Sequence, residues 1–257
     1  MNKVTVVIVS IIILCFGGFV IWAVSSSKSG AIDFDLYDPS TVIQPSDDNG
    51  QIGDRVRGNA ESPVVFIEYA DFQCPGCAAI YPNIEILFGE YSDRVAFVFR
   101  HFPLSAIHPN AKASAAAAEA AGIQGYFFEM TNSLFINQSV WSLANGSERA
   151  KVFAELFKQI APEGDVDKFK SDMASTEVSK KVSFDTDLGT KRNNITGTPT
   201  FFVNNDRIDL AGSSAEASFL SVIREHLDAK LAEHDLPTGS QNPSYAEEHD
   251  PDDGHGH

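Results

Sequence analysis

The feature that most constrains the fold is a cysteine motif that separates an apolar segment from a segment with helical periodicity. Residues 64–70 are apolar apart from Glu68, which is typical of a strand covered on both faces. The motif Cys-Pro-Gly-Cys follows at residues 74–77, and residues 78–91 carry apolar side chains at helical spacing. A second apolar run, at 95–99, completes a strand–helix–strand unit. The sequence therefore predicts an α/β fold with the cysteines at the start of its first helix.

Cys74 and Cys77 have the spacing and the position of a redox pair. Residues at i and i+3 of a helix lie on one face, close enough for a disulfide with little strain. Pro75 suits the first helical position, which leaves Cys74 as the capping residue beside the positive end of the helix dipole. Because that environment stabilises a thiolate, we predict that Cys74 has a lowered pKa and is the exposed nucleophile. Cys77 is then the buried resolving thiol.

Two other uses of the pair are open from the residues alone. One is half of a zinc site, but zinc needs two more ligands, and the remaining cysteine, Cys15, lies in a long apolar run. No histidines are spaced as a matching pair near the motif. The other use is an inert structural disulfide. We favour the redox pair over both, and we expect no metal ion and no cofactor other than the Cys74–Cys77 disulfide itself.

The N-terminal apolar run has the length of a membrane anchor. Residues 4–24 contain no charged side chain and would span about 31 Å as a helix, which matches a bilayer core. A signal peptide usually has a shorter apolar region, although small residues near Ala23 leave cleavage open. Lys3 precedes the run and acidic residues follow it, which favours an extracytoplasmic location for the rest of the chain. We expect a transmembrane anchor at 1–24 and a linker at 25–62 that is rich in Ser, Asp, Gly and Pro and contains short apolar segments, one of which could form an edge strand.

The remainder of the chain predicts two kinds of folded segment and a tail. Residues 108–192 carry helical patterns almost throughout, whereas strand character returns at 200–203 and a last amphipathic helix follows. Residues 63–107 and 193–232 are therefore predicted to form the α/β part. Residues 233–257, which are acidic and rich in histidine, show no sustained periodicity and are predicted to be disordered. The helices expected in the helical block are 111–121, 126–135, 148–160, 166–173 and 176–188.

The charge of the chain excludes one class of partner. The sequence has 35 acidic and 19 basic residues, for a net charge of −16. Such a chain repels phosphate backbones instead of displacing their counterions. We therefore expect no binding to nucleic acid.

Several motifs carry a family resemblance. They are residues 68–77, 99–104, 125–128, 134–138 and 197–201, together with the alanine-rich segment. With these motifs the chain resembles a DsbA-like thiol–disulfide oxidoreductase of the thioredoxin superfamily, over roughly residues 55–232. The resemblance implies a thioredoxin-like fold in which the helical block, 108–192, is a domain inserted between two strands, and this agrees with the helical patterns described above.

The resemblance also implies roles for residues outside the cysteine pair. It implies that Pro199 follows a cis peptide bond and that the backbone of Thr198 lies against the disulfide and holds an extended substrate segment; the alternative is that Pro199 merely begins a strand. Glu68 occupies the position of a buried acid that exchanges a proton with Cys77, unless it forms a salt bridge with a lysine or arginine. Gly76 replaces the histidine of the best-known oxidant of the family, so the direction of electron flow stays open.

These observations predict a membrane-tethered, extracytoplasmic enzyme that donates the Cys74–Cys77 disulfide to reduced or misoxidised exported proteins. A membrane redox partner would then reoxidise the pair, as the resemblance implies. The first alternative is a thiol reductase or disulfide isomerase that uses the same residues. The second is a tethered peptide-binding or chaperone module with a structural disulfide.

Overall fold

The central sheet is built around the two apolar runs that flank the cysteine motif. The computed structural model describes residues 31–210 and 216–240. Strands β2 (Val65–Ala70) and β3 (Ala96–His101) are parallel, and every residue of both is buried, as their continuous apolar runs predict. The other three strands are antiparallel to their neighbours and complete the order β1-β3-β2-β4-β5. They are β1 (Arg55–Gly58), β4 (Thr200–Val203) and β5 (Asp206–Arg207).

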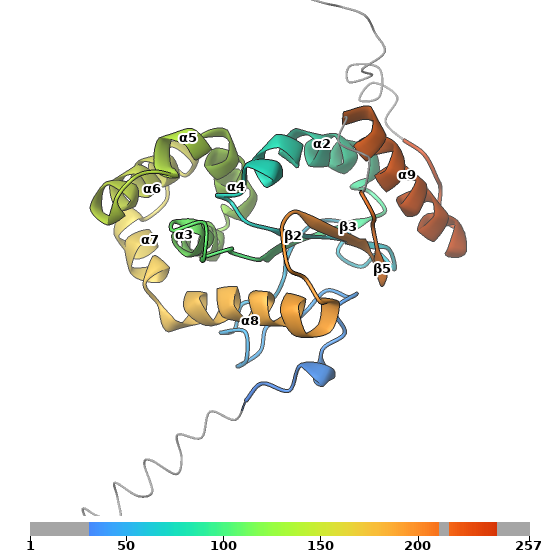
Figure 1. The fold of residues 1–257 in the computed structure, drawn as a ribbon, viewed down its shortest axis with the longest axis horizontal. Helices are drawn as coiled ribbons and strands as arrows, with labels where there is room; N and C mark the ends of the chain where they lie inside the picture. Colours follow the sequence, from blue (N-terminus) through green and yellow to red (C-terminus); the bar gives the residue numbers. More distant parts are fainter. Residues whose placement is uncertain (1–30, 211–215, 241–257) are drawn as a thin grey trace, which may run out of the picture. The chain divides into compact units, whose positions relative to one another are not determined.

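Helices cover both faces of the sheet (Figure 1). Successive strand residues point to opposite faces, so Phe66 packs on one side with α2 (Pro75–Tyr91) and α9 (Glu216–Glu233). Tyr69 packs on the other side, which α8 (Thr176–Asn193) covers. At Gly189 of α8 an added Cβ would lie only 2.9 Å from the Tyr69 ring, so the close approach of this helix to the sheet requires glycine there.

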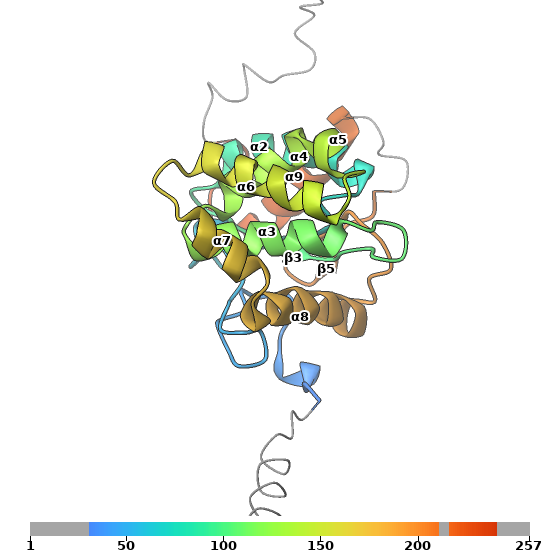
Figure 2. The ribbon, with the colours of Figure 1, turned by 90° about the vertical axis from the view of Figure 1, so that its left-hand side faces the viewer.

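The chain between β3 and β4 forms six helices, five of them gathered at one side of the sheet (Figures 1 and 2). The side chains of Asn145, Asp165 and Ser175 each accept a hydrogen bond from a backbone amide in the first turn of the helix that follows. Because such amides have no partner within the helix, these caps explain where three of the helices begin. The sequence did not predict the four-residue helix α5. Besides α8 the helices are α3 (Ala111–Ile123), α4 (Phe127–Ile136), α5 (Gln138–Trp141), α6 (Gly146–Ile160) and α7 (Val166–Met173).

Residues 34–62, predicted as part of a linker, are folded onto the sheet. They contain the short 3-10 helix η1 (Phe34–Leu36) and strand β1, which pairs with β3. The guanidinium of Arg100, on β3, donates hydrogen bonds to the backbone carbonyl of Thr41 and to the Asp54 carboxylate, both at 2.7 Å. The composition of this segment is that of a loop, but an arginine far along the chain donates to several of its buried oxygen atoms.

Residues 233–240, predicted as the start of a disordered tail, are part of the fold. Leu236 packs against the core beside α9, and the Gly239 amide donates a hydrogen bond to Asp228 at 2.7 Å. Residues 241–257 and the predicted anchor at 4–24 lie outside the described residues. Within the ranges 31–210 and 216–240, no helix is both long enough and apolar enough to cross a membrane.

Candidate active site

Cys74 directly precedes α2 and caps its N-terminus. Its backbone is extended, and Pro75 occupies the first helical turn, as predicted. The neighbouring Cys77 thiol stabilises the Cys74 thiolate and lowers the pKa of Cys74 to about 5. The Thr198 side chain and the first-turn amides of Cys77 and Gly76 act in the same direction, whereas burial acts in the opposite direction.

Cys77 is the more buried thiol of the pair. Burial raises its pKa well above the ordinary value, and its hydrogen bond to Cys74 and the nearby charge of Glu68 act in the same direction. Both cysteines are free thiols in this structure. The pair therefore consists of one thiol that ionises readily and one that stays protonated.

The prediction that Cys74 is exposed is wrong. Only 8 % of the residue is accessible, because it belongs to the apolar cluster between α2 and the helical block and faces the Thr198–Pro199 segment. Cys77 is 0 % exposed. Cys74 is consequently the one member of the pair that solvent or a substrate can reach.

The segment before β4 brings a backbone carbonyl to the Cys74 sulfur. The Cys74 thiol donates to the Thr198 carbonyl oxygen at 3.4 Å, and the Thr198–Pro199 peptide bond is cis, as predicted. A Cβ added at Gly76 would lie 3.5 Å from Pro199 Cδ and 3.7 Å from the Cys74 sulfur, which are ordinary contacts. There is therefore room for a side chain at position 76, and that side chain would lie beside Pro199 and the Cys74 sulfur.

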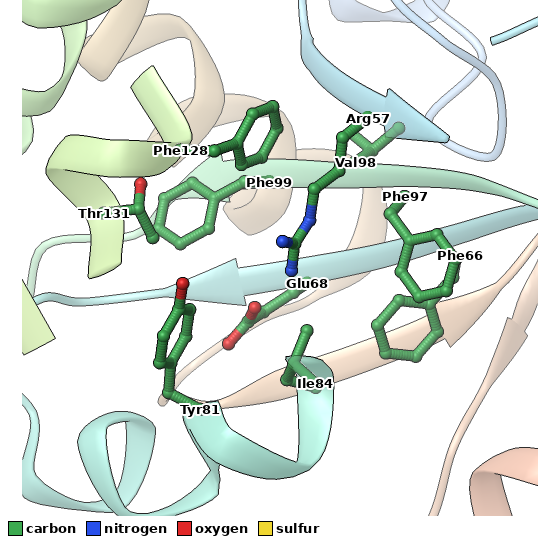
Figure 3. Close-up of a pocket in the computed structure, with 10 residues that line it drawn as sticks. All are labelled: Arg57, Phe66, Glu68, Tyr81, Ile84, Phe97, Val98, Phe99, Phe128 and Thr131. Atoms are coloured by element: carbon green, nitrogen blue, oxygen red, sulfur yellow. The ribbon is translucent and has the colours of Figure 1, made fainter. Parts of the chain in front are cut away.

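Glu68 projects from β2 into a small pocket between the sheet, α2 and α4 (Figure 3). The pocket has a volume of about 20 Å³, enough for one water molecule, and Tyr81 and Thr131 also line it. Burial raises the pKa of Glu68 to about 8, while the charge of Arg57 acts against the rise. Neither Glu68 Oε1 nor Thr131 Oγ1 has a hydrogen-bond partner among the described residues.

The surroundings of Glu68 differ from those of a salt-bridged carboxylate. Arg57 is the cation whose charge most affects Glu68, but its Nη1 donates to Glu85 at 2.9 Å. In the part of the chain that the structure describes, no ion pair to Glu68 is formed within 4.0 Å. A buried carboxyl of raised pKa near the Cys77 thiol can hold or deliver a proton at neutral pH.

Two polar side chains to which the sequence assigned no role fix the turn before Cys74. The buried Asp71 carboxylate accepts hydrogen bonds from the Leu104 amide at 2.9 Å and from the Gln73 amide at 2.8 Å, and its Oδ2 lies 2.7 Å from Nδ1 of His108. The side chain of Gln73 donates to the Ser142 carbonyl at 2.8 Å. The turn is therefore tied to the segment after β3 and to the end of α5.

A third polar contact comes from Gln138, the first residue of α5. Its Nε2 donates to the carbonyl oxygens of Phe72 and Cys74 at 2.8 and 3.0 Å. Gln138 lies in one of the motifs that carry the family resemblance, 134–138, but nothing in that motif indicates which side chain reaches the active site.

The alternative of a zinc site gains no further ligands from the fold. Among residues 31–210 and 216–240, no three His, Cys, Asp or Glu side chains are grouped so that they could hold a metal ion. Cys74 and Cys77 are surrounded instead by apolar side chains and by backbone hydrogen bonds.

Comparison with known proteins gives matches of two kinds at the level of sequence. The family model described as thioredoxin matches residues 51–223. A protein named Na(+)/H(+) antiporter NhaA 3 from Salinispora tropica is 33% identical over 199 residues, which are 74% of this chain and 28% of that protein. A protein named Na(+)/H(+) antiporter NhaA 1 from Mycolicibacterium gilvum is 35% identical over 159 residues, 60% of this chain and 24% of that protein. The chain thus spans about a quarter of the length of these curated relatives.

Solved structures with the same fold include BdbD from Bacillus subtilis and alpha-DsbA1 from Wolbachia pipientis. Oxidised BdbD from Bacillus subtilis has a TM-score of 0.57 and 23% identity, and the match covers 75% of this chain and 98% of that one. Wolbachia pipientis alpha-DsbA1 has a TM-score of 0.55 and 23% identity, with 70% and 94% covered. The predicted thioredoxin-like α/β fold with inserted helices is therefore confirmed.

Proposed function

This chain belongs to the thioredoxin family, and on that basis we propose that it is a DsbA-type thiol–disulfide oxidoreductase that acts outside the cytoplasm as an oxidase of exported proteins. The observation that carries the proposal is the contrast between the two thiols: Cys74, with a pKa of about 5, is within reach of a partner, and Cys77, with a raised pKa, is buried. Stabilising the Cys74 thiolate stabilises the reduced enzyme, and this makes the disulfide a better oxidant.

The proposed reaction starts from the oxidised enzyme. A substrate thiolate attacks the Cys74 sulfur, the Cys74–Cys77 bond breaks, and Cys77 leaves with the electron pair and takes up a proton, for which Glu68 is the proposed donor. A second substrate thiolate then attacks the substrate sulfur of the mixed disulfide, and Cys74 leaves as a thiolate. The substrate has lost two electrons and gained a disulfide, and the enzyme dithiol has gained those two electrons.

The carbonyl of Thr198 beside Cys74 supports the proposed role of the Thr198–Pro199 segment in substrate binding. Its oxygen is 3.4 Å from the sulfur, so a bound extended segment would place its own cysteine next to a backbone acceptor. A membrane redox partner that reoxidises the dithiol, and an anchor at residues 4–24, complete the proposal. It depends on the cysteine pair and not on the antiporter names of the curated relatives.

We expect the reduced protein to have a higher Tm than the oxidised protein at pH 7, and the difference to shrink as the pH falls. The pKa of Cys74 is about 5 in the folded protein, below the ordinary thiol value of 9.0, so the thiolate contributes its full stabilisation above pH 9. This stabilisation decreases as the pH falls from 9 and is lost as the pH falls through 5. Thermal unfolding of both forms across this range measures the effect. An oxidised form with the higher Tm at pH 7 would favour the reductase or isomerase over the oxidase.

Glu68→Gln is expected to slow exchange and at the same time to stabilise the protein. Loss of the proton donor should slow the release of Cys77 on the order of a hundredfold, the low end of general acid–base catalysis. The carboxyl has an ordinary pKa of 4.5 and a folded pKa of about 8, so its burial destabilises the fold more and more as the pH rises from 4.5 to 8. At pH 7 this cost is on the order of 3 kcal/mol, and glutamine, which does not ionise, avoids it.

Stopped-flow exchange with a model dithiol and urea unfolding at pH 4 and pH 7 test this pair of effects. The gain in stability should be close to zero at pH 4, where the folded carboxyl is protonated and the unfolded carboxyl, with an ordinary pKa of 4.5, is mostly protonated. Glu155→Gln, on the exposed face of α6, is the matched control and should change neither quantity. A variant of Glu68 that is less stable than the wild type at pH 7 would instead support the salt-bridge interpretation.

A further inference from the structure

Gln138 bridges two carbonyl groups on either side of one residue of the active-site turn. Its side-chain nitrogen donates at 2.8 Å to the carbonyl of Phe72 and at 3.0 Å to that of Cys74, and Gln73 lies between them. A primary amide has two N–H donors, so both hydrogen bonds can form at once. Gln138 therefore uses its whole donor capacity on the backbone next to the reactive sulfur.

The position of the Cys74 carbonyl affects how the chain enters α2. It belongs to the peptide unit that enters α2, and it also accepts the first hydrogen bond of the helix, from the Ala78 amide at 3.2 Å. The next residue, Pro75, has no N–H through which the chain could be held. The orientation of this peptide unit also sets where the amides of Gly76 and Cys77 lie relative to the Cys74 sulfur. Both amides belong to the first helical turn, where an N–H has no partner within the helix, and both lower the pKa of Cys74.

The backbone that carries Gln138 is fixed by contacts with α4. Trp141, at the other end of α5, is fully buried, and its indole nitrogen donates to the Leu134 carbonyl of α4 at 2.9 Å. The amide of Asn137 donates to the Ser133 carbonyl at 3.1 Å, so the backbone is fixed on both sides of Gln138. The contact therefore ties the cysteine turn to the helices inserted between β3 and β4 and not to the sheet.

We propose that Gln138 is a positioning residue that holds the peptide units around Cys74 in the orientation in which the amides of Gly76 and Cys77 face the Cys74 sulfur. It acts through the backbone and touches neither sulfur nor substrate. The inference deepens the proposed function and rests on it, because the orientation of these amides sets how well the reduced, thiolate form is stabilised and thus how strongly the disulfide oxidises.

The test compares Gln138→Glu and Gln138→Ala with wild type in the full chain. The rate of alkylation of Cys74 by iodoacetamide as a function of pH gives its pKa, and peptide mass spectrometry separates Cys74 from Cys15 and Cys77. We expect the pKa to rise by about one unit in Gln138→Ala and further in Gln138→Glu, which adds a negative charge near the thiolate. The equilibrium constant of the Cys74–Cys77 disulfide with glutathione should fall roughly tenfold, since one pKa unit corresponds to a factor of ten.

The matched control is Gln124→Ala, which removes another glutamine side chain that makes two hydrogen bonds to the backbone. Gln124 Nε2 donates to the Asp165 carbonyl at 3.0 Å, and its Oε1 accepts from the Asp165 amide at 2.9 Å, so it joins α3 to the start of α7 on the exposed surface. This variant should leave the pKa of Cys74 and the glutathione equilibrium unchanged.

An unchanged Cys74 pKa in folded Gln138→Glu would overturn the proposal. Glutamate has the same shape as glutamine, so this variant decides the question if Gln138→Ala fails to fold. A shift of the same size in Gln124→Ala would also overturn it, since the effect would then follow from general loosening of the helices. If the wild type catalyses no exchange, the proposed function fails, but the alkylation pKa still reports on the role of Gln138.

Discussion

Replacing Cys74 by serine is expected to abolish catalysed thiol–disulfide exchange. A serine hydroxyl does not ionise near neutral pH and cannot form a disulfide, whereas the Cys74 thiol, with a pKa of about 5, is almost wholly a thiolate at pH 7. We expect the rate on a model dithiol peptide to fall on the order of a thousandfold or more, to that of the uncatalysed reaction. The formation of the peptide disulfide, followed by mass spectrometry in a glutathione buffer, measures this loss.

Two further serine variants separate the roles within the pair. Cys77→Ser keeps the reactive thiol but cannot close the enzyme disulfide, so mixed disulfides with the peptide should accumulate at Cys74. Cys15→Ser, in the predicted anchor, should leave the exchange rate unchanged. Exchange by Cys74→Ser at the wild-type rate would reject the catalytic interpretation and leave the binding or chaperone module as the better hypothesis.

Asp54→Asn is expected to cause the largest loss of stability. The Asp54 carboxylate accepts from Arg100 Nη2 at 2.7 Å and from Lys181 Nζ at 3.2 Å, and all three side chains are 0 % exposed. The isosteric amide removes the charge and leaves two buried cations with less compensation. Removing one partner of a buried ion pair typically costs about 3–5 kcal/mol, and we expect the free energy of unfolding to fall by about that amount.

Urea unfolding of this variant tests whether the segment 34–62 is held as the structure describes. The matched control is Asp172→Asn, because Asp172 pairs with Lys168 on the exposed surface of α7 at 2.5 Å, where an ion pair contributes at most about 1 kcal/mol. Equal small effects in the two variants would mean that the buried cluster around Arg100 contributes no more than a surface pair.

Much of the fold followed from local patterns. The continuous apolar runs before and after the cysteine motif became β2 and β3, and residues 166–173 became α7 at the predicted boundaries. Burial on both faces of a strand and capping at the start of a helix act over a few residues, so they leave a signal in a short stretch of sequence. The loop-like composition of residues 34–62 carried only a weak signal, since its buried partners lie elsewhere in the chain.

By itself the sequence determined the reactive chemistry of the protein: two thiols one helical turn apart, a proline that begins the helix and a free capping position for Cys74, all within four residues. Only the tertiary structure decided what surrounds them. The Gln138 amide that holds the Cys74 carbonyl lies 64 residues further along the chain, and the Thr198 carbonyl lies 124 residues away. The buried environment that raises the pKa of Glu68 is likewise assembled from β3, α2 and α4. Hydrogen bonds and desolvation depend on distances in space, and packing alone brings such distant residues within a few ångströms of each other.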